Sequence, residues 1–251
     1  MTPTDTTLDT FFDGALRFEQ ARRGYRFSID AILLGSIAVG AATVLDAGCG
    51  VGVVGLVAAH HNPGARVVGV EVQPSLAAAA RRSVALSGLE ERVRILQADL
   101  RDLARHPAWP DGAPLEPVEL ILMNPPYFPA NSGRLNPDDE RAAARHEVHG
   151  TLAELLRASR ALLARSGRLR LIYPAEALPR LMATVTAAGL KPTRLRPIHP
   201  FPDAPARLIL LDARVSGRRE LELAPGLIIH TAPDRYHPEV QAALDGAPVV
   251  L

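Results

Sequence analysis

Apolar residues along the chain form two alternating kinds of segment. Short apolar runs bounded by polar residues, glycine or proline are typical of buried strands. They cover residues 43–47, 66–72, 93–98, 118–123, 168–173, 190–199 and 207–215. Segments with helical spacing cover residues 29–38, 53–60, 74–86, 151–163 and 176–187. Strands that alternate with helices predict an α/β fold with a doubly wound, mostly parallel sheet.

Both ends of the chain predict additions to this sheet. Residues 1–9 are polar, and we expect a mobile terminus. Alternating pieces at 16–19 and 25–27 predict a small hairpin, followed by the helix at 29–38 with Ser28 as its N-cap. The last two strands are joined by a proline-containing turn and predict an antiparallel pair. Beyond them lie short strand pieces and one expected helix at 238–244.

Composition limits the class of protein without naming its chemistry. The chain has 251 residues, 47% of them hydrophobic, and a net charge of +1, so nucleic acid would have to bind through local patches. Cys49 is the only cysteine, which excludes an internal disulfide and a thiolate metal cluster. No signal segment or membrane-length apolar run is evident, so we expect a cytoplasmic protein without a membrane partner.

The fourth apolar run ends in an unusual tetrapeptide, Asn124-Pro125-Pro126-Tyr127. Proline cannot donate to a sheet ladder, so the strand stops there. The amide oxygen of Asn124 and the carbonyl of Pro125 can accept both hydrogens of a planar amino group, while Tyr127 stacks on its ring. This would position the nitrogen for direct group transfer without a covalent intermediate. The alternative is a stiff loop with a surface aromatic residue.

A glycine-rich turn, Asp46-Ala47-Gly48-Cys49-Gly50-Val51-Gly52, follows the first strand. Its glycines let the backbone turn tightly and approach a ligand closely. Residues 50–55 also match the dinucleotide-binding pattern, with the acidic Glu71 about 20 residues further on. The turn alone therefore allows a nicotinamide-dependent enzyme.

Other observations favour S-adenosylmethionine as the ligand. Asp46 would repel a pyrophosphate but suits the ammonium group of a methionine moiety. Glu71 can bind ribose hydroxyls, and Asp99 can accept a hydrogen bond from an adenine amino group. Each carboxylate taken singly could be a surface or capping residue. All of them, with Asn124, lie at predicted carboxyl ends of strands, where such folds bind ligands.

Two further candidates carry less chemistry. Cys49 lies inside the glycine turn, and methyl transfer from a sulfonium needs no protein nucleophile, so we reject a nucleophilic role. His60 and His61 end a helix, where a positive charge is favourable, and no further ligands accompany them; we predict no metal site.

The motifs together resemble one family. Residues 25–34 (Tyr-Arg-Phe-Ser-Ile-Asp-Ala-Ile-Leu-Leu), the glycine turn, residues 70–73, Asp99, residues 124–128 and residues 144–147 (Ala-Arg-His-Glu) occur in that order. This set is similar to the bacterial tRNA(Val) adenine N6-methyltransferases, which modify the adenosine just 3′ of the anticodon, position 37. The similarity runs from about Leu16 to Arg214. Residues 80–88 depart from it, because relatives typically carry asparagines near positions 83 and 87.

The resemblance implies a Rossmann-like methyltransferase fold in a single domain over residues 1–251. Residues 1–42 would close the cofactor site, residues 43–215 form the catalytic core and residues 216–251 a C-terminal extension. It also implies a flipped adenine from a tRNA anticodon loop as substrate.

The residues and the resemblance together assign three sets of site residues. The catalytic set is Asn124, Pro125, Pro126 and Tyr127. The cofactor-binding set is Ser28, Asp30, Asp46, Ala47, Gly48, Gly50, Gly52, Glu71, Val72, Asp99, Leu100 and Asn124. The substrate-binding set is Tyr127, Phe128, Arg134, Arg141 and Arg145, with Arg22 and Arg23 as further candidate phosphate contacts.

Rival functions remain open at this point. The same tetrapeptide serves enzymes that methylate DNA adenine, rRNA bases or a protein glutamine amide. The last would need an N-terminal helical domain to grip its protein, and only about 40 residues precede the first core strand. Outside this class stand a nicotinamide-dependent oxidoreductase and a cofactor-binding module without turnover.

Overall fold

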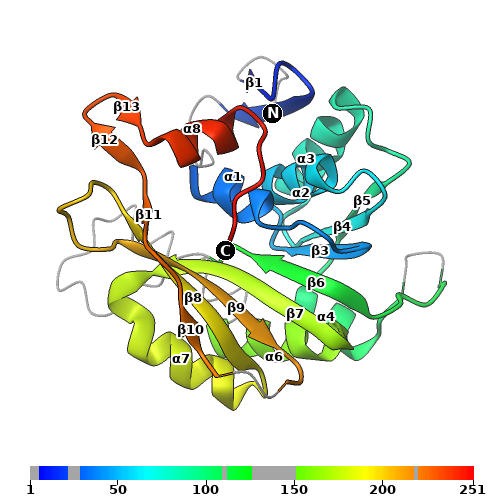
Figure 1. Ribbon diagram of the computed structural model, residues 1–251. Coiled ribbons are helices and arrows are strands. Elements are labelled where there is room, and N and C mark those ends of the chain that lie inside the picture. Colours follow the sequence, from blue (N-terminus) through cyan, green and yellow to red (C-terminus); the bar gives the residue numbers. More distant parts are fainter. Residues whose placement is uncertain (1–5, 22–28, 109–111, 126–150, 218–219) are drawn as a thin grey trace, which may run out of the picture.

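The computed structural model describes residues 6–21, 29–108, 112–125, 151–217 and 220–251 (Figure 1). Its centre is a sheet of nine strands in the order β10-β8-β9-β7-β6-β3-β4-β5, with β11 also paired to β8. These strands are β3 (Thr43–Ala47), β4 (Arg66–Glu71), β5 (Val93–Gln97), β6 (Val118–Met123), β7 (Leu163–Pro174), β8 (Lys191–His199), β9 (Leu208–Arg214), β10 (Glu222–Leu223) and β11 (Leu227–Ile228).

The strand directions confirm a mostly parallel, doubly wound sheet. β3 pairs in parallel with both β4 and β6, and β5 and β7 extend the sheet in parallel on either side. The chain fills one half of the sheet first and then crosses to the other side of β3. This creates a switch point between β3 and β6, the place where open α/β sheets bind their ligands. β9 runs antiparallel between β7 and β8, as the last two strands predicted.

Helices cover both faces of the sheet (Figure 1). One face carries α1 (Ile29–Ser36), α2 (Val53–His61), α3 (Pro74–Leu86) and α8 (Pro238–Leu244); the other carries α4 (Leu100–Arg105), α6 (Leu152–Leu162), the 3-10 turn η1 (Ala175–Ala177) and α7 (Leu178–Ala187). Residues of β6 alternate between the two cores: Leu120 and Leu122 pack in one, Ile121 and Met123 in the other. Burial on both faces explains why residues 120–123 of this strand are all apolar.

The N-terminal hairpin lies earlier in the chain than expected. β1 (Thr6–Phe11) pairs antiparallel with β2 (Leu16–Ala21), so residues 6–9 belong to a strand and the predicted mobile terminus is wrong from Thr6 onward. Phe12, Asp13 and Gly14 all have positive φ and form the turn. Residues 6–11 contain three threonines and a phenylalanine, residue types that favour strands, and these are the signal in the sequence for β1. The expected second strand at 25–27 lies outside the described residues.

Smaller differences occur elsewhere. α4 follows directly after Asp99, outside the predicted helices, and β7 begins five residues before its predicted start. The C-terminal segment contains a short hairpin of β12 (His230–Ala232) and β13 (Arg235–Tyr236), and the expected helix is confirmed as α8 (Pro238–Leu244). Within the described part of the chain, no helix is both long and apolar enough to span a membrane.

Candidate active site

The glycine turn between β3 and α2 is built on left-handed backbone. Gly48, Gly50 and Gly52 have φ values of 74°, 56° and 93°, a region that side chains with a Cβ rarely adopt. The N–H groups of Gly48 and Cys49 donate to the Val70 carbonyl at 2.9 and 3.0 Å, which fixes the turn against β4. A Cβ added at Gly48 or Gly50 would meet no atom within 4 Å. The turn is therefore open on the side where a ligand would approach.

Asp46 lies under this turn and points toward α2. It is 1% exposed, and its Oδ2 accepts a hydrogen bond from the Gly55 N–H at 2.8 Å. Burial raises the pKa of Asp46 from 3.8 to about 7; the Gly55 hydrogen bond opposes this, and the charge of Glu71 adds to it. The carboxylate satisfies one of the N–H groups that the first turn of a helix leaves unpaired. Asp46 thus holds the first turn of α2 with a carboxyl group whose pKa is about 7.

Glu71 ties the glycine turn to the segment after β4. Its Oε2 accepts from the Gly50 N–H at 2.9 Å, and its Oε1 accepts from the Gln73 N–H at 2.9 Å. The side chain is 5% exposed. Each carboxylate oxygen has a further lone pair, so Glu71 could also accept hydrogen bonds from ligand hydroxyls while it holds both backbone segments.

Asp99 follows β5 and caps α4. One oxygen accepts from the Arg101 N–H at 2.8 Å, and the Arg101 guanidinium reaches both oxygens, at 3.0 Å from Nε and 2.6 Å from Nη2. These hydrogen bonds lower the pKa of Asp99 below its usual value. A fixed, ionised acceptor therefore stands at the carboxyl end of β5. Leu100, the next residue, is buried at the start of α4.

Asn124 follows the last residue of β6 at the switch point. Met123 pairs with Ala47 in the register of β6 and β3, so Asn124 leaves the sheet beside Gly48. Asn124 is partly buried and Pro125 is buried. The four strand ends that carry the turn, Glu71, Asp99 and Asn124 thus form one edge of the sheet.

The remaining predicted residues fall into two groups. Ala47 is buried at the end of β3, Val72 is partly buried after β4, and Asp30 is partly buried in the first turn of α1. The others lie outside the described residues: Ser28, Pro126, Tyr127, Phe128, Arg134, Arg141 and Arg145, together with Arg22 and Arg23.

Cys49 and the two histidines have clear structural environments. Burial, with the charges of Asp46 and Glu71, raises the pKa of the Cys49 thiol well above its usual value, so the thiol is protonated. His60 and His61 pack against the Phe12 ring, and burial lowers the pKa of both, that of His61 to about 4. The prediction of a favourable positive charge on His60 and His61 at the end of α2 is therefore wrong. Among the described residues, no group of His, Cys, Asp and Glu is placed to hold a metal ion.

Arg101 is a site residue that the sequence did not single out. Besides gripping Asp99, its Nη1 lies 3.6 Å from Glu154. Glu154 forms a capping box with Thr151 at the start of α6, immediately after residues 126–150. The Thr-x-x-Glu spacing was visible in the sequence. The contact between Arg101 of α4 and Glu154 of α6 joins segments that are distant in the sequence, so it could be seen only in the folded structure.

The fold and this edge define the class of Rossmann-like methyltransferases. Residues 44–113 match the family model described as a methyltransferase domain. Among solved structures, a predicted O-methyltransferase from Agrobacterium tumefaciens has a TM-score of 0.69 at 23% identity, covering 88% of this chain and 98% of that one. TYW2 from P. horikoshii, in complex with MeSAdo, has a TM-score of 0.57 at 15% identity, covering 86% and 74%.

Relatives of known name define the family within this class. Two Porphyromonas gingivalis proteins are 31% and 32% identical over 246 residues, covering 94% of this chain and 92% of each relative. A Tolumonas auensis protein is 31% identical over 232 residues, covering 90% and 91%. All three are named tRNA1(Val) (adenine(37)-N6)-methyltransferase. The chain belongs to this family, which confirms the resemblance, and it is an S-adenosylmethionine-dependent methyltransferase.

Proposed function

We propose that the chain transfers a methyl group to N6 of the adenine at position 37 of a tRNA. The relatives that match over more than nine-tenths of the chain carry this activity in their names. The observation that carries the proposal here is the position of Asn124, beside the open glycine turn at the switch point of the sheet.

The turn and its neighbouring carboxylates fit S-adenosylmethionine. The open space beside Gly48 and Gly50 admits a ligand close to the backbone. In our proposal Glu71 binds the ribose hydroxyls and Asp99 accepts from the adenine amino group. The carboxylate of Asp46, buried beneath the turn, attracts the methionine ammonium through its charge. The remaining contacts would come from Ser28, Asp30, Ala47, Gly52, Val72, Leu100 and Asn124. The bound cofactor supplies an electrophilic methyl group on a sulfonium.

The chain's own contribution to the chemistry is to position the acceptor amine. The Asn124 Oδ1 and the Pro125 carbonyl would each accept one amino hydrogen of the target base. The amine lone pair, otherwise delocalised into the ring, is then directed at the methyl group. Pro126 stiffens the turn and Tyr127 stacks on the base. No protein nucleophile takes part, which agrees with a protonated, buried Cys49.

Recognition of tRNA would use the segment after the tetrapeptide. An anticodon-loop base is already single-stranded, so flipping it into the site costs little. Phe128 would help to stack the base, and Arg134, Arg141 and Arg145 would contact phosphates. An rRNA base or a protein glutamine amide is the alternative acceptor, since either offers the same planar amino group.

The test is transfer of labelled methyl from S-adenosylmethionine to total tRNA of a strain that lacks this activity, followed by nucleoside analysis. Wild type should yield labelled N6-methyladenosine. Asn124→Ala should lose at least about 100-fold in kcat, because an acceptor used in the transition state is gone. Cofactor affinity should fall by a much smaller factor, because Asn124 is only one of the proposed cofactor contacts. Asn124→Asp keeps acceptor oxygens and should retain more activity than Asn124→Ala.

Other outcomes would redirect or overturn the assignment. Label absent from tRNA, with cofactor bound, would exclude tRNA as the substrate; rRNA and protein acceptors would then be assayed in the same way. Binding of a nicotinamide cofactor in place of S-adenosylmethionine would overturn the proposal and favour an oxidoreductase. Cofactor binding without transfer to any acceptor would indicate a binding module.

A further inference from the structure

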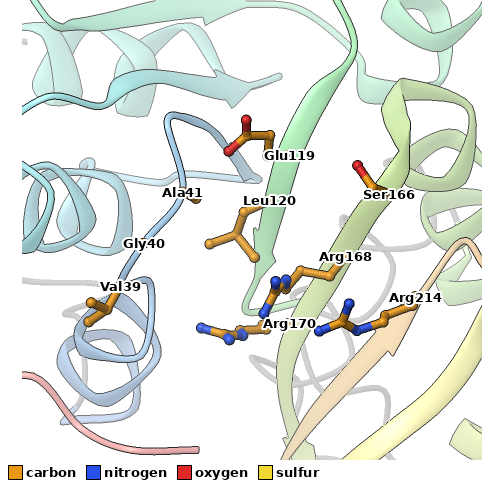
Figure 2. Close-up of a pocket in the computed structure, with 9 residues that line it drawn as sticks. All are labelled: Val39, Gly40, Ala41, Glu119, Leu120, Ser166, Arg168, Arg170 and Arg214. Atoms are coloured by element: carbon orange, nitrogen blue, oxygen red, sulfur yellow. The ribbon is translucent and has the colours of Figure 1, made fainter. Parts of the chain in front are cut away.

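A concave site lies at the opposite edge of the sheet from Asn124. It is a cavity of about 230 Å³ at the amino ends of β3 and β6, and its lining includes Arg168, Arg170, Arg214, Glu119 and Ser166 (Figure 2). Figure 2 shows the three guanidinium groups gathered beside Leu120. Arg168 pairs with Leu120, which lies four positions before Asn124, or roughly 13 Å along the strand at ~3.3 Å per residue. Asn124 is not among the residues that line the cavity. The cavity is therefore separate from the methyl-transfer site.

The strand register places like charges directly opposite one another here. Arg168 of β7 pairs with Arg214 of β9, which in turn pairs with Lys191 of β8. Like charges facing each other across strands destabilise a sheet. Two residues further along the same strands, Arg170 pairs with Asp212 and forms an ion pair at 2.9 Å. The positive charge of Arg170 is thus balanced by Asp212 across the strands, whereas Arg168, Arg214 and Lys191 face one another.

The nearby carboxylates, Asp212 and Glu119, already have other hydrogen-bond partners. Asp212 is 5% exposed, accepts from Arg170 and from the Thr193 hydroxyl at 2.8 Å, and is 3.9 Å from Arg214. Glu119 accepts from the Ala42 N–H at 2.8 Å. The side chain of Arg168 makes no hydrogen bond or ion pair with any of the residues that the structure describes.

The cluster therefore keeps an excess of positive charge. Three guanidiniums face two carboxylates, and Arg168 and Arg214 are partly exposed at the cavity. Guanidinium groups bind phosphate oxygens through paired N–H donors, and the exposed Ser166 could add a hydroxyl. The volume is far larger than the ~15 Å³ that a cavity needs to hold one water molecule. It admits a phosphate group with part of its ester.

We propose that Arg168, Arg170 and Arg214 form a binding site for a phosphate group. The phosphate could belong to a free anion, such as inorganic phosphate or a nucleotide, or to the backbone of a bound RNA. The RNA source rests on the proposed function, whereas the free anion does not. The roughly 13 Å of strand between the level of Arg168 and Asn124 is a distance that a folded RNA spans easily, since a duplex carries phosphates every few ångströms.

The test uses the full chain and the double variant Arg168→Gln/Arg214→Gln. Arg170 is left intact because its ion pair with Asp212 and its hydrogen bond to the Ile37 carbonyl hold the fold together. Arg165→Gln, an exposed arginine of β7 outside the cavity lining, is the matched control. Circular dichroism and cofactor affinity, equal in all three proteins, establish that each variant is folded.

Two readouts then separate the sources. Calorimetric titration with inorganic phosphate and with AMP measures the affinity of the protein for a free phosphate-bearing anion. Filter binding of tRNA at several salt concentrations measures the affinity for tRNA and its dependence on salt. Each phosphate contact that is lost should reduce the slope of log K against log salt concentration by about 0.7 to 0.9. We expect the double variant to lose affinity on the order of tenfold in one readout, with the Arg165→Gln control unchanged.

Each outcome decides the proposal. Loss of phosphate binding alone assigns a free anion, and loss of tRNA affinity with a reduced salt slope assigns the RNA backbone. If the double variant binds phosphate and tRNA as tightly as wild type, with the same salt slope, the proposed phosphate site is refuted. Neither readout depends on methyl transfer, so failure of the proposed function would not be mistaken for failure of this site.

Discussion

Replacing Asp46 by asparagine should stabilise the folded protein above neutral pH. The pKa of Asp46 rises from 3.8 to about 7 because the carboxylate is buried beneath the glycine turn. Each pKa unit corresponds to about 1.4 kcal/mol, so ionising the buried group costs the folded state about 4 kcal/mol at most. Asparagine keeps an oxygen that can accept the Gly55 N–H and carries no charge.

The pH dependence gives this prediction its sign. A folded pKa above the unfolded one means that folding takes up a proton between about pH 4 and 7. Stability from this group is complete below about pH 4 and is lost as the pH rises through 7. The difference in unfolding free energy between Asp46→Asn and wild type should therefore grow across that range, by up to about 4 kcal/mol, and then level off.

Urea denaturation of the cofactor-free protein between pH 4.5 and 8.5 measures this difference. The Asp203→Asn variant, at an exposed aspartate, serves as the control and should follow wild type at each pH. A difference that does not change with pH, or an Asp46→Asn protein less stable than wild type at pH 8, would refute the reasoning.

Three further predictions concern the same edge. Gly50→Ala should lose about 1–2 kcal/mol of stability, because alanine is strained at a φ of 56°. It should also bind the cofactor more weakly when measured by calorimetry. The control Gly64→Ala, at a glycine with open surroundings and no positive φ, should change neither stability nor cofactor binding. Glu71→Ala should lose about 1–3 kcal/mol in urea denaturation, because two backbone N–H groups lose their acceptor; Glu71→Gln should lose less, and equal losses would contradict the two-bond arrangement. Native Cys49 should react with iodoacetamide at least about tenfold more slowly than in the unfolded chain, since its raised pKa suppresses the thiolate; equal rates would contradict its burial.

The sequence determined the elements that depend on local patterning. β3 (Thr43–Ala47) and α3 (Pro74–Leu86) begin and end where their apolar residues, glycines and proline predict. The parallel sheet followed from the alternation of strands and helices. Asn124 and the glycine turn could be assigned to one edge because the carboxyl ends of neighbouring parallel strands meet there.

Tertiary structure decided what depends on partners distant in the chain. Asp46 and Glu71 were visible as carboxylates at strand ends, but their bonds to Gly55 and Gly50 depend on how the turn folds back over them. The contacts of Arg101, and the meeting of Arg168 with Arg214, require strands and helices brought together from separate parts of the chain. Burial and charge at such meeting points set the pKa of Asp46 and of His61, and no local pattern records them.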